Sequence, residues 1–540
     1  MLCTPMNRVP PATNRTMPMR PRRQALSGLV GACLLGLVLL APVSARAAAP
    51  RHDPTLEQQL LAGITQLASD EFAGREPGTD GEKKTLRYLA RQWFDIGLVS
   101  GTNDPSHPWF APVTLVGREP AGSRAEFSRR GRPVVLGPED LRVMTFGRRG
   151  MVQRAPFYFV GRMAGDVPSR TELAGRIAVL LDKASPRMGG EVVPLAVRQN
   201  ALLEGGAAAV LTVLDGTRSL SMIGERRRHQ GFALADGAPE GDLEAYVTTN
   251  GMARLMGATD AVDTLGREAD RPDFAPHLLD LTASLEATTR QTTIRTHNVI
   301  GRLPGRHPEA GAVLLLAHWD HFGTCGVGRP GVPDTNPTGA GPHLICNGAV
   351  DNASGLAGLT EIARRLAHQS GGLDRDVYFL ATTAEEMGLL GAEAFAESPP
   401  LPLGQIVAAF NLDSIAIAPA GGPLGVVGAG MTRLDAGIAV VAREQHRKLV
   451  PPEWPNSFLK RQDGWALIRH DIPAVMVTSA YGDRERFEHY LSTDYHRPGD
   501  VVKPGLELGG AVEDVAFHLA LVRYFADPRQ WSGSASATER

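Results

Sequence analysis

Apolar residues recur at helical spacing in two segments of the N-terminal part of the chain. Between residues 56 and 68 the apolar positions are Leu56, Leu60, Leu61, Ile64 and Leu67, a spacing that predicts an amphipathic helix. A Gly- and Pro-containing segment, residues 74–79, follows it. The second pattern covers residues 82–96 and stops at Gly97, a residue type that commonly ends helices. Two helices therefore open the folded part of the chain.

Strand and helix patterns alternate from about residue 293 onward. A helix is predicted over residues 354–368, where Glu361 and Arg365 form an i,i+4 pair. Buried strands are predicted over residues 312–316, 377–382, 406–412, 424–427 and 474–478. This alternation favours an α/β fold with a mostly parallel central sheet flanked by helices.

The middle of the chain has a different pattern. Apolar β-like runs, such as residues 177–181 and 208–213, alternate with turns and a helix at 196–204. We find no cluster of candidate catalytic residues between residues 126 and 285. We therefore expect a β-rich domain at 126–285, inserted into a discontinuous domain of residues 48–125 and 286–530. Residues 531–540 are rich in Ser, Gly and Ala, and we expect a disordered tail.

The composition is that of a soluble globular protein. The chain has 540 residues, of which 43% are hydrophobic and 21% are charged, and its length favours more than one domain. The formal net charge is −2, and the body of the chain has no long basic run. These features argue against a nucleic-acid partner.

The N-terminal residues have the features of a secretory signal peptide. Arg20, Arg22 and Arg23 precede an apolar run at 25–42, and Ala45-Arg46-Ala47 is a small-x-small cleavage pattern. The alternative is a transmembrane anchor, but the run is short and contains several glycines. Residues 1–47 hold six Arg and no other charged residue, so cleavage would change the formal charge from −2 to −8. We expect an exported protein, periplasmic or secreted, with no stable membrane span after cleavage.

Two cysteines would remain after that cleavage. Cys3 and Cys33 precede residue 47, whereas Cys325 and Cys346 lie in the body of the chain. In an oxidising compartment Cys325 and Cys346 could form a disulfide, and the alternative is two free thiols. The chain has no Cys-x-x-Cys spacing, which argues against a Cys-rich zinc site.

Five short segments supply residues suited to binding and using two metal ions. Imidazole and carboxylate ligands suit zinc, and a paired zinc site suits the attack of water on an amide. Several of these segments directly follow predicted strands, whose carboxyl ends gather ligands in open α/β sheets. The candidate residues are His318, Asp351, Glu385, Glu386, Asp413 and His496.

The residue types suggest a division of roles. Two neighbouring cations need a bridging carboxylate, and Asp351 suits that role. One ion would then take His318 and Asp413, and the other would take Glu386 and His496. Glu385 would remain beside the ions, where it can accept a proton from the attacking water and pass it to the leaving amine. Asp320, two residues after His318, could orient the imidazole from behind.

These segments, in this order, resemble the motifs of the M28 family of zinc peptidases. Residues 67–78 and 297–300 also resemble segments that flank the inserted protease-associated (PA) domain in some members, so the resemblance covers about residues 55–525. It implies two Zn²⁺ ions and an aminopeptidase whose substrates are peptides with a free N-terminus. It also implies a cis Asp351–Asn352 peptide bond and an Asn352 side chain that supports the ligands without binding metal. By the same resemblance, Tyr495 would donate its hydroxyl to the developing oxyanion.

The chain departs from the family at one motif. Where members often have Ser-Asp-His, this chain has Gln462-Asp463-Gly464, so the substrate pocket is expected to differ. His321, three residues after His318, is the main rival ligand. His343, His470 and His489 are interpreted as structural or solvated histidines. The Gly- and Pro-rich region 323–346 is expected to shape the entrance.

Other functions remain open from the sequence. A carboxypeptidase would need a cation for the substrate carboxylate, for which Arg461 is the candidate, and a glutaminyl cyclase is a further alternative. A non-catalytic, receptor-like relative would have lost metal ligands, and none is lost here. The chain has no Gly-x-Ser-x-Gly motif, which argues against a serine hydrolase.

Overall fold

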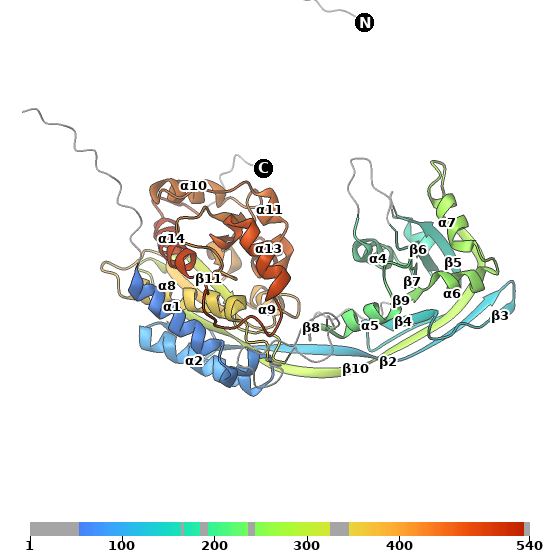
Figure 1. Ribbon diagram of the computed structural model, residues 1–540, viewed down its shortest axis with the longest axis horizontal. Helices are drawn as coiled ribbons and strands as arrows, with labels where there is room; N and C mark the ends of the chain where they lie inside the picture. The colour runs from blue at the N-terminus through green and yellow to red at the C-terminus, as the bar shows by residue number, and fades with distance from the viewer. Residues whose placement is uncertain are drawn as a thin grey trace, which may run out of the picture. The chain divides into compact units, whose positions relative to one another are not determined.

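A computed structural model describes residues 53–163, 167–183, 193–229, 231–235, 243–324 and 345–533 (Figure 1). The predictions for the signal peptide, for Cys325, for His343 and for residues 534–540 fall outside these ranges. Within them, no helix has both the length and the apolar character that a bilayer crossing requires.

A mixed sheet with parallel central strands forms the core of the C-terminal part. Its strand order is β14-β15-β13-β11-β12-β10. The pairs β15–β13, β13–β11 and β11–β12 are parallel, whereas β14 and β10 pair antiparallel with their neighbours. The strands are β10 (His277–Leu303), β11 (Ala312–His318), β12 (Asp376–Thr382), β13 (Ile406–Asn411), β14 (Gly425–Val427) and β15 (Ala474–Thr478). The α/β class and all five predicted strands are therefore confirmed.

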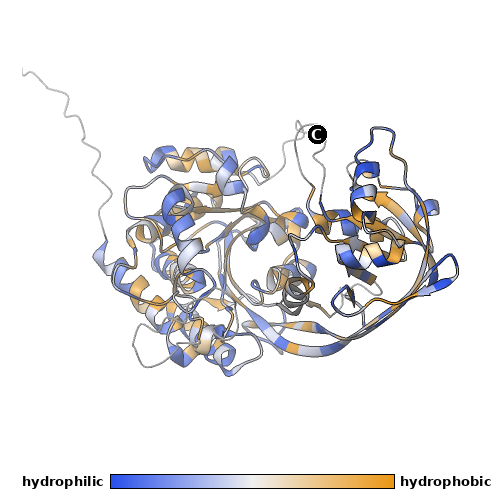
Figure 2. Ribbon diagram, turned by 45° about the vertical axis from the view of Figure 1, so that its right-hand side comes forward, coloured by the Kyte–Doolittle hydropathy of each residue, from blue (hydrophilic) through white to orange (hydrophobic). Residues whose placement is uncertain are grey.

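Helices cover both faces of these strands. Val313 and Leu315 of β11 contact one hydrophobic cluster, and Leu314 and Leu316 contact another on the opposite face. Every residue of β11, β12 and β13 is consequently buried, which explains their continuous apolar sequences. In Figure 2 the helices carry both hydrophilic and hydrophobic residues, as expected for helices that pack one side against a core.

The first face is covered by helices from distant parts of the sequence. Side chains of α1, α2, α8, α10 and α14 all belong to its cluster. These helices are α1 (Pro54–Leu67), α2 (Asp80–Ile96), α8 (Gly355–Ala367), α10 (Asp435–Glu444) and α14 (Gly509–Phe525). Shorter helices complete this part: α9 (Leu390–Glu397), α11 (Glu453–Asn456), α12 (Gly464–Arg469) and α13 (Arg484–Thr493). The three helices predicted at 56–68, 82–96 and 354–368 correspond to α1, α2 and α8.

Local chemistry explains where the first two helices begin and end. The Asp53 carboxylate accepts hydrogen bonds from the backbone N–H groups of Thr55 and Leu56, which caps α1. Pro54 occupies the first turn, where its missing N–H costs nothing. Helix α2 ends at Gly97, whose φ of 97° lies in the left-handed region that glycine adopts readily.

Residues 126–285 contain helices as well as strands. Part of the sheet runs in the order β5-β6-β7-β9-β4, with β5, β6, β7 and β9 parallel. The strands are β3 (Arg132–Val134), β4 (Leu141–Thr145), β5 (Arg149–Gly161), β6 (Ile177–Leu181), β7 (Ala209–Val213), β8 (Phe232–Leu234) and β9 (Leu243–Val247). The helices are α3 (Arg170–Leu173), α4 (Leu195–Glu204), α5 (Leu220–His229), α6 (Thr249–Met256) and α7 (Ala261–Ala269). This region has hydrophobic clusters of its own.

Two long strands continue across the expected boundaries of this region. β2 (Phe110–Arg129) passes residue 125, and β10 passes residue 286. The two strands pair antiparallel over almost all of β2, with one register shift at Thr288 and Thr289 (Figure 1). A short strand, β1 (Val99–Ser100), also pairs with β10. The assignment of residues 126–285 to a separate PA domain stays a prediction.

Helix α14 places an ionisable side chain inside the first cluster. His518 is fully buried, its Nδ1 donates to the Asp514 carbonyl, and its ring lies 6.2 Å from that of Phe410. Burial lowers the pKa of His518 from 6.5 to about 4, because an uncompensated imidazolium is unfavourable in an apolar core.

We expect His518 to make the protein sensitive to acid. Because its folded pKa is depressed, its contribution to stability is complete above about pH 6.5 and is lost as the pH falls through about 4. The free energy of unfolding should fall between pH 7 and pH 4.5 in the wild type. In His518→Leu this fall should be smaller by about 2 kcal/mol. Urea unfolding of both proteins in a chelator would measure this difference, and identical pH dependences would contradict it.

Candidate metal centre

Four of the six candidate residues lie where parallel strands end. His318 is the last residue of β11, Glu385 and Glu386 follow β12, and Asp413 follows β13. Since β11, β12 and β13 are parallel neighbours, their carboxyl ends meet at one edge of the sheet. Asp351 lies in the turn before α8, and His496 follows α13. The structure therefore brings all six residues to one edge.

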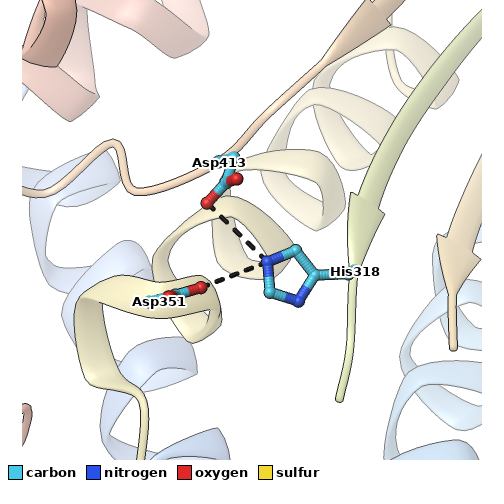
Figure 3. A group of neighbouring side chains, drawn as sticks. All are labelled: His318, Asp351 and Asp413. Carbon is cyan, nitrogen blue, oxygen red and sulfur yellow. Dashed lines mark ion pairs between the residues drawn. The ribbon is translucent and has the colours of Figure 1, made fainter. Parts of the chain in front are cut away.

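A first cluster consists of His318, Asp351 and Asp413 (Figure 3). His318 Nε2 lies 3.1 Å from Asp351 Oδ1 and 3.7 Å from Asp413 Oδ1. All three residues are buried. The donor set, one imidazole and two carboxylates, is one that binds zinc in proteins.

A second cluster forms around Glu386. Its Oε2 lies 3.1 Å from His496 Nε2, and its Oε1 lies 2.7 Å from His321 Nδ1. His321 is 1% exposed and belongs with Asp351 and Glu386 to a group that could hold a metal ion. The rival histidine of the sequence analysis therefore lies at the site as an additional nitrogen donor.

Asp351 lies between the two clusters. Its Oδ1 is the oxygen near His318, and its Oδ2 lies 3.2 Å from His496 Nε2. One carboxylate thus presents each of its oxygens to a different set of donors. This is the geometry that a carboxylate shared by two cations requires.

Several buried polar atoms of these clusters make no hydrogen bond and are available to bind a cation. Among the described side chains, His318 Nε2, Glu386 Oε1 and both ring nitrogens of His321 are buried and make no hydrogen bond. Buried polar atoms without partners are costly. Metal ions bound in the two clusters could be ligated by His318 Nε2, by Glu386 Oε1 and by one ring nitrogen of His321, so these residues fit bound metal.

We expected the Asp320 carboxylate to orient the imidazole of His318, but the main chain of Asp320 does so instead. The Nδ1 of His318 bonds to the main-chain carbonyl of Asp320 at 3.1 Å, whereas the Asp320 carboxylate lies 3.9 Å away. Because a carbonyl only accepts, Nδ1 carries the proton and Nε2 faces the cluster. The carboxylate instead accepts the backbone N–H groups of Glu385 and Glu386, at 3.0 and 3.3 Å. It therefore positions the segment after β12.

Asn352 joins two of the ligand segments. Its side-chain amide donates to the Leu412 carbonyl, and its carbonyl oxygen accepts the N–H groups of Gly355 and Ser414. Asp413 lies between Leu412 and Ser414, so Asn352 holds the backbone on both sides of that ligand. The Asp351–Asn352 peptide bond is cis, as the resemblance implied.

Left-handed backbone conformations occur at the ends of several ligand segments. Ala384, Ser414 and His496 have φ values of 52°, 54° and 56°. Such conformations are unfavourable for residues with a Cβ atom, by about 1 kcal/mol or more each, and concentrate at functional sites. Gly348 also has a positive φ, and a Cβ there would collide with the Asp351 carbonyl.

A buried arginine joins the N-terminal segment to the site. The guanidinium of Arg75 donates to the carbonyls of Leu67, Trp319, Asn347 and Gly348. Trp319 follows His318, and residues 347 and 348 lead into Asp351. Burial lowers the pKa of Arg75 to about 10, although Asp500 and the site carboxylates oppose this effect. The side chain thus remains charged at neutral pH, and it anchors two ligand segments.

The electrostatics of the site favour positive charge. Burial alone would lower the pKa of His318, but the nearby carboxylates of Glu385, Asp351 and Asp413 raise it well above its usual range. Burial raises the pKa of Glu385, and the charge of Glu386 adds to this increase. A carboxyl group with a raised pKa suits proton transfer near neutral pH.

Tyr495 lies directly beside a candidate ligand. Its ring stacks on His496 with centroids 3.6 Å apart, and its hydroxyl accepts a hydrogen bond from Arg461 at 3.2 Å. Burial raises the pKa of Tyr495, so the hydroxyl keeps its proton. Arg461, the cation considered for a carboxypeptidase, is exposed next to this hydroxyl.

The segment that departs from the family motif is buried behind the site. Asp463 accepts a hydrogen bond from the Thr382 hydroxyl, and Gln462 accepts from the side chain of Asn411. Burial raises the pKa of Asp463 to about 6. Gln462 and Asp463 therefore connect α12 to the ends of β12 and β13.

The remaining histidines and cysteines have simpler roles where they are described. His470 pairs with Glu393 at 2.7 Å, away from the two clusters, and His489 is exposed. Cys346 is disulfide-bonded, and Cys325 lies outside the described residues.

Arg75 was missed by the sequence analysis because nothing in the sequence indicates which carbonyls a long side chain reaches.

Comparisons with known proteins show which family part of the chain resembles. Residues 298–519 match peptidase family M28, and this segment contains every candidate site residue. This part of the chain therefore resembles an M28 peptidase domain. A vacuolar membrane protease of Yarrowia lipolytica is 32% identical over 110 residues, which are 20% of this chain and only 9% of that relative.

Two solved structures align with most of the chain. An aminopeptidase from Aneurinibacillus sp. strain AM-1 has a TM-score of 0.50 at 18% identity, over 87% of this chain and 93% of that one. A zinc aminopeptidase from Bacillus subtilis aligns at 18% identity with a TM-score of 0.44, over 90% of this chain and 98% of that one. The first of these similarities supports the α/β fold.

We expect Arg75→Lys to disturb both stability and metal binding. A lysine offers three donors from one nitrogen and cannot reach carbonyls that lie around a planar guanidinium. Buried carbonyls left without partners should lower the free energy of unfolding by about 2 kcal/mol or more. Urea unfolding and Co²⁺ absorption spectra would measure the two effects.

Arg198 provides a matched control for this variant. It is also buried, and it donates to the carbonyls of Arg162, Leu181, Asp182 and Val193, all remote in sequence from the ligands. Arg198→Lys should lower stability and leave Co²⁺ binding unchanged. Wild-type stability and Co²⁺ binding in Arg75→Lys would refute the role of Arg75.

Proposed function

We propose that the protein is an exported di-zinc aminopeptidase that removes N-terminal residues from peptides. The observation that carries the proposal is the position of Asp351, whose two oxygens face separate donor sets. His318 and Asp413 would complete one zinc site, and Glu386 with His496 the other. His321 lies close enough to Glu386 to add a donor to the second site. Export rests on the signal-like residues 1–47.

The chemistry divides between the ions and the protein. Bound zinc ions supply Lewis acidity, which polarises the scissile carbonyl and acidifies water. Glu385 precedes the proposed ligand Glu386. Its backbone N–H donates to the Asp320 carboxylate, which fixes the position of the 385–386 segment. Glu385 accepts the proton of the attacking water and donates it to the leaving amine. A carboxylate beside the attacking water can perform both steps.

Tyr495 stabilises the oxyanion in this proposal. Its hydroxyl keeps its proton, and its ring stacks on His496. Arg461 donates to the phenol oxygen, which leaves the phenol proton available for the substrate. The donor of Arg461 also makes the phenol a better hydrogen-bond donor.

Glu385→Gln should separate catalysis from metal binding. A glutamine keeps the size of the side chain and cannot accept a proton, so kcat should fall by at least about 100-fold. The zinc content should stay at the wild-type value, because Glu385 is not a ligand in this proposal. Elemental analysis after dialysis and initial rates on a peptide would measure both.

The neighbouring Glu386→Gln is the matched control. It removes a proposed ligand by the same chemical change, so zinc content should fall together with activity. Near-normal turnover in Glu385→Gln would refute its role as the base. Loss of zinc from Glu385→Gln alone would reverse the roles of the two glutamates.

One peptide prepared in three forms would test the substrate class. The free, N-acetylated and C-amidated forms would each be incubated with the mature protein, and the products identified by mass spectrometry. We expect loss of the N-terminal residue from the free and amidated forms, and no cleavage after acetylation. A chelator should abolish cleavage, and added zinc should restore it.

The same experiment discriminates against the alternatives. Cleavage that tolerates acetylation and requires a free C-terminus would indicate a carboxypeptidase with Arg461 as the carboxylate-binding cation. Cyclisation of an N-terminal glutamine, tested with a second peptide, would indicate a glutaminyl cyclase. Zinc binding without turnover of any peptide would refute the aminopeptidase proposal and favour a receptor-like role.

A further inference from the structure

Asp500 is a buried carboxylate that belongs to neither donor set. It is 2% exposed, and it accepts three hydrogen bonds from the protein. Its Oδ1 accepts the Val350 N–H at 2.8 Å, and its Oδ2 accepts the Asp351 N–H at 3.1 Å and the Tyr490 hydroxyl at 3.0 Å. Both oxygens are therefore engaged, and one of the donors is the backbone of the bridging ligand.

The main chain of Asp500 reinforces the same connection. Its carbonyl accepts the Ala349 N–H at 3.1 Å, so three consecutive backbone donors, from residues 349, 350 and 351, bind this one residue. Asp500 lies only four residues after His496, in the same loop, and its own N–H donates to Arg497. The loop that carries one ligand is thereby attached to the turn that carries another.

This attachment fixes the position of the Asp351 carboxylate between His318 and His496. Asp351 presents Oδ1 to His318 at 3.1 Å and Oδ2 to His496 at 3.2 Å. A shift of the Asp351 backbone relative to the 496–500 loop would change the second distance and rotate the first oxygen away. Three hydrogen bonds to a side chain that has only two rotatable bonds leave little freedom for such a shift.

We propose that Asp500 is a positioning residue that sets the geometry of the bridging Asp351 and of His496 for binding the second of two zinc ions. The inference rests on the proposed di-zinc function. It assigns Asp500 no contact with substrate or metal, and its effect passes through the backbone of residues 350 and 351.

Only a carboxylate satisfies all the donors at this position. In Asp500→Asn one oxygen becomes an NH₂ group, which cannot accept. Whichever way the amide turns, it faces the N–H of Val350 or of Asp351, donor against donor. One backbone donor next to the bridging ligand then loses its partner or moves. The substitution is nearly isosteric, so packing is retained.

Asp514 provides a matched control. It is also fully buried, and it accepts the Ser479 N–H and the hydroxyls of Thr478 and Ser479. None of these partners is a candidate ligand or adjoins one. Asp514→Asn therefore makes the same chemical change away from the site, although an amide oxygen in the place of Oδ2 could still accept all three donors.

The test measures zinc affinity directly. Metal-free wild type, Asp500→Asn and Asp514→Asn would be titrated with zinc in competition with a chromophoric chelator, and metal-free thermal unfolding would be recorded for each. We expect Asp500→Asn to lose about 10-fold or more in affinity for the weaker zinc ion, as mutation of supporting residues commonly does. The affinity for the tighter ion should change less, and Asp514→Asn should bind both ions like the wild type.

Each result decides the proposal. Wild-type zinc affinities in a folded Asp500→Asn overturn it, and so does an equal loss in Asp514→Asn, which would indicate a general effect of destabilisation. If Asp500→Asn does not fold, Tyr490→Phe removes one of the three hydrogen bonds and should weaken the second zinc ion measurably; unchanged affinity there overturns the proposal. A wild type that binds fewer than two zinc ions would refute the di-zinc function itself, which is a separate outcome.

Discussion

The site depends on one buried guanidinium. Arg75 binds four backbone carbonyls that belong to α1, to the residue after His318 and to the turn before Asp351. A buried charge is costly unless hydrogen bonds and opposite charges compensate it. Here both are present, because the carboxylates of Asp500, Asp351, Asp320 and Glu386 surround it. Arg75 therefore connects the N-terminal helix α1 to the rest of the domain and holds the segments that carry His318 and Asp351.

The rest of the site follows from an excess of buried negative charge. Six buried carboxyl groups, on Asp320, Asp351, Glu386, Asp413, Asp463 and Asp500, lie near one edge of the sheet. Arg75 balances some of this charge, and burial raises the pKa of Asp320 to about 7 and that of Asp463 to about 6. Negative charge remains at Asp351 and Glu386, which lie beside several imidazoles. Several buried atoms of these side chains make no hydrogen bond. Cations would complete this balance.

Much of the fold could be predicted from local patterns. The strands at 177–181 and 474–478 match β6 and β15 at both ends, and the other predicted strands are within two residues of those observed. These strands are buried on both faces, so their apolar runs are continuous and easily recognised. The continuity of β10 over 27 residues was not predicted, because its exposed middle lacks that apolar signal.

The sequence by itself determined the order and residue types of the candidate ligands, since most of them follow a recognisable strand and Asp351 precedes a helix. It could not determine which histidine and carboxylate atoms meet. His321 joins the site, and the Asp320 carboxylate binds backbone N–H groups, whereas its main-chain carbonyl holds the imidazole of His318. Arg75 and Asp500 act on carbonyls and N–H groups 244 and 150 residues away. Backbone groups are the same in every residue, so such partners leave no pattern in the sequence, and only the tertiary structure decides them.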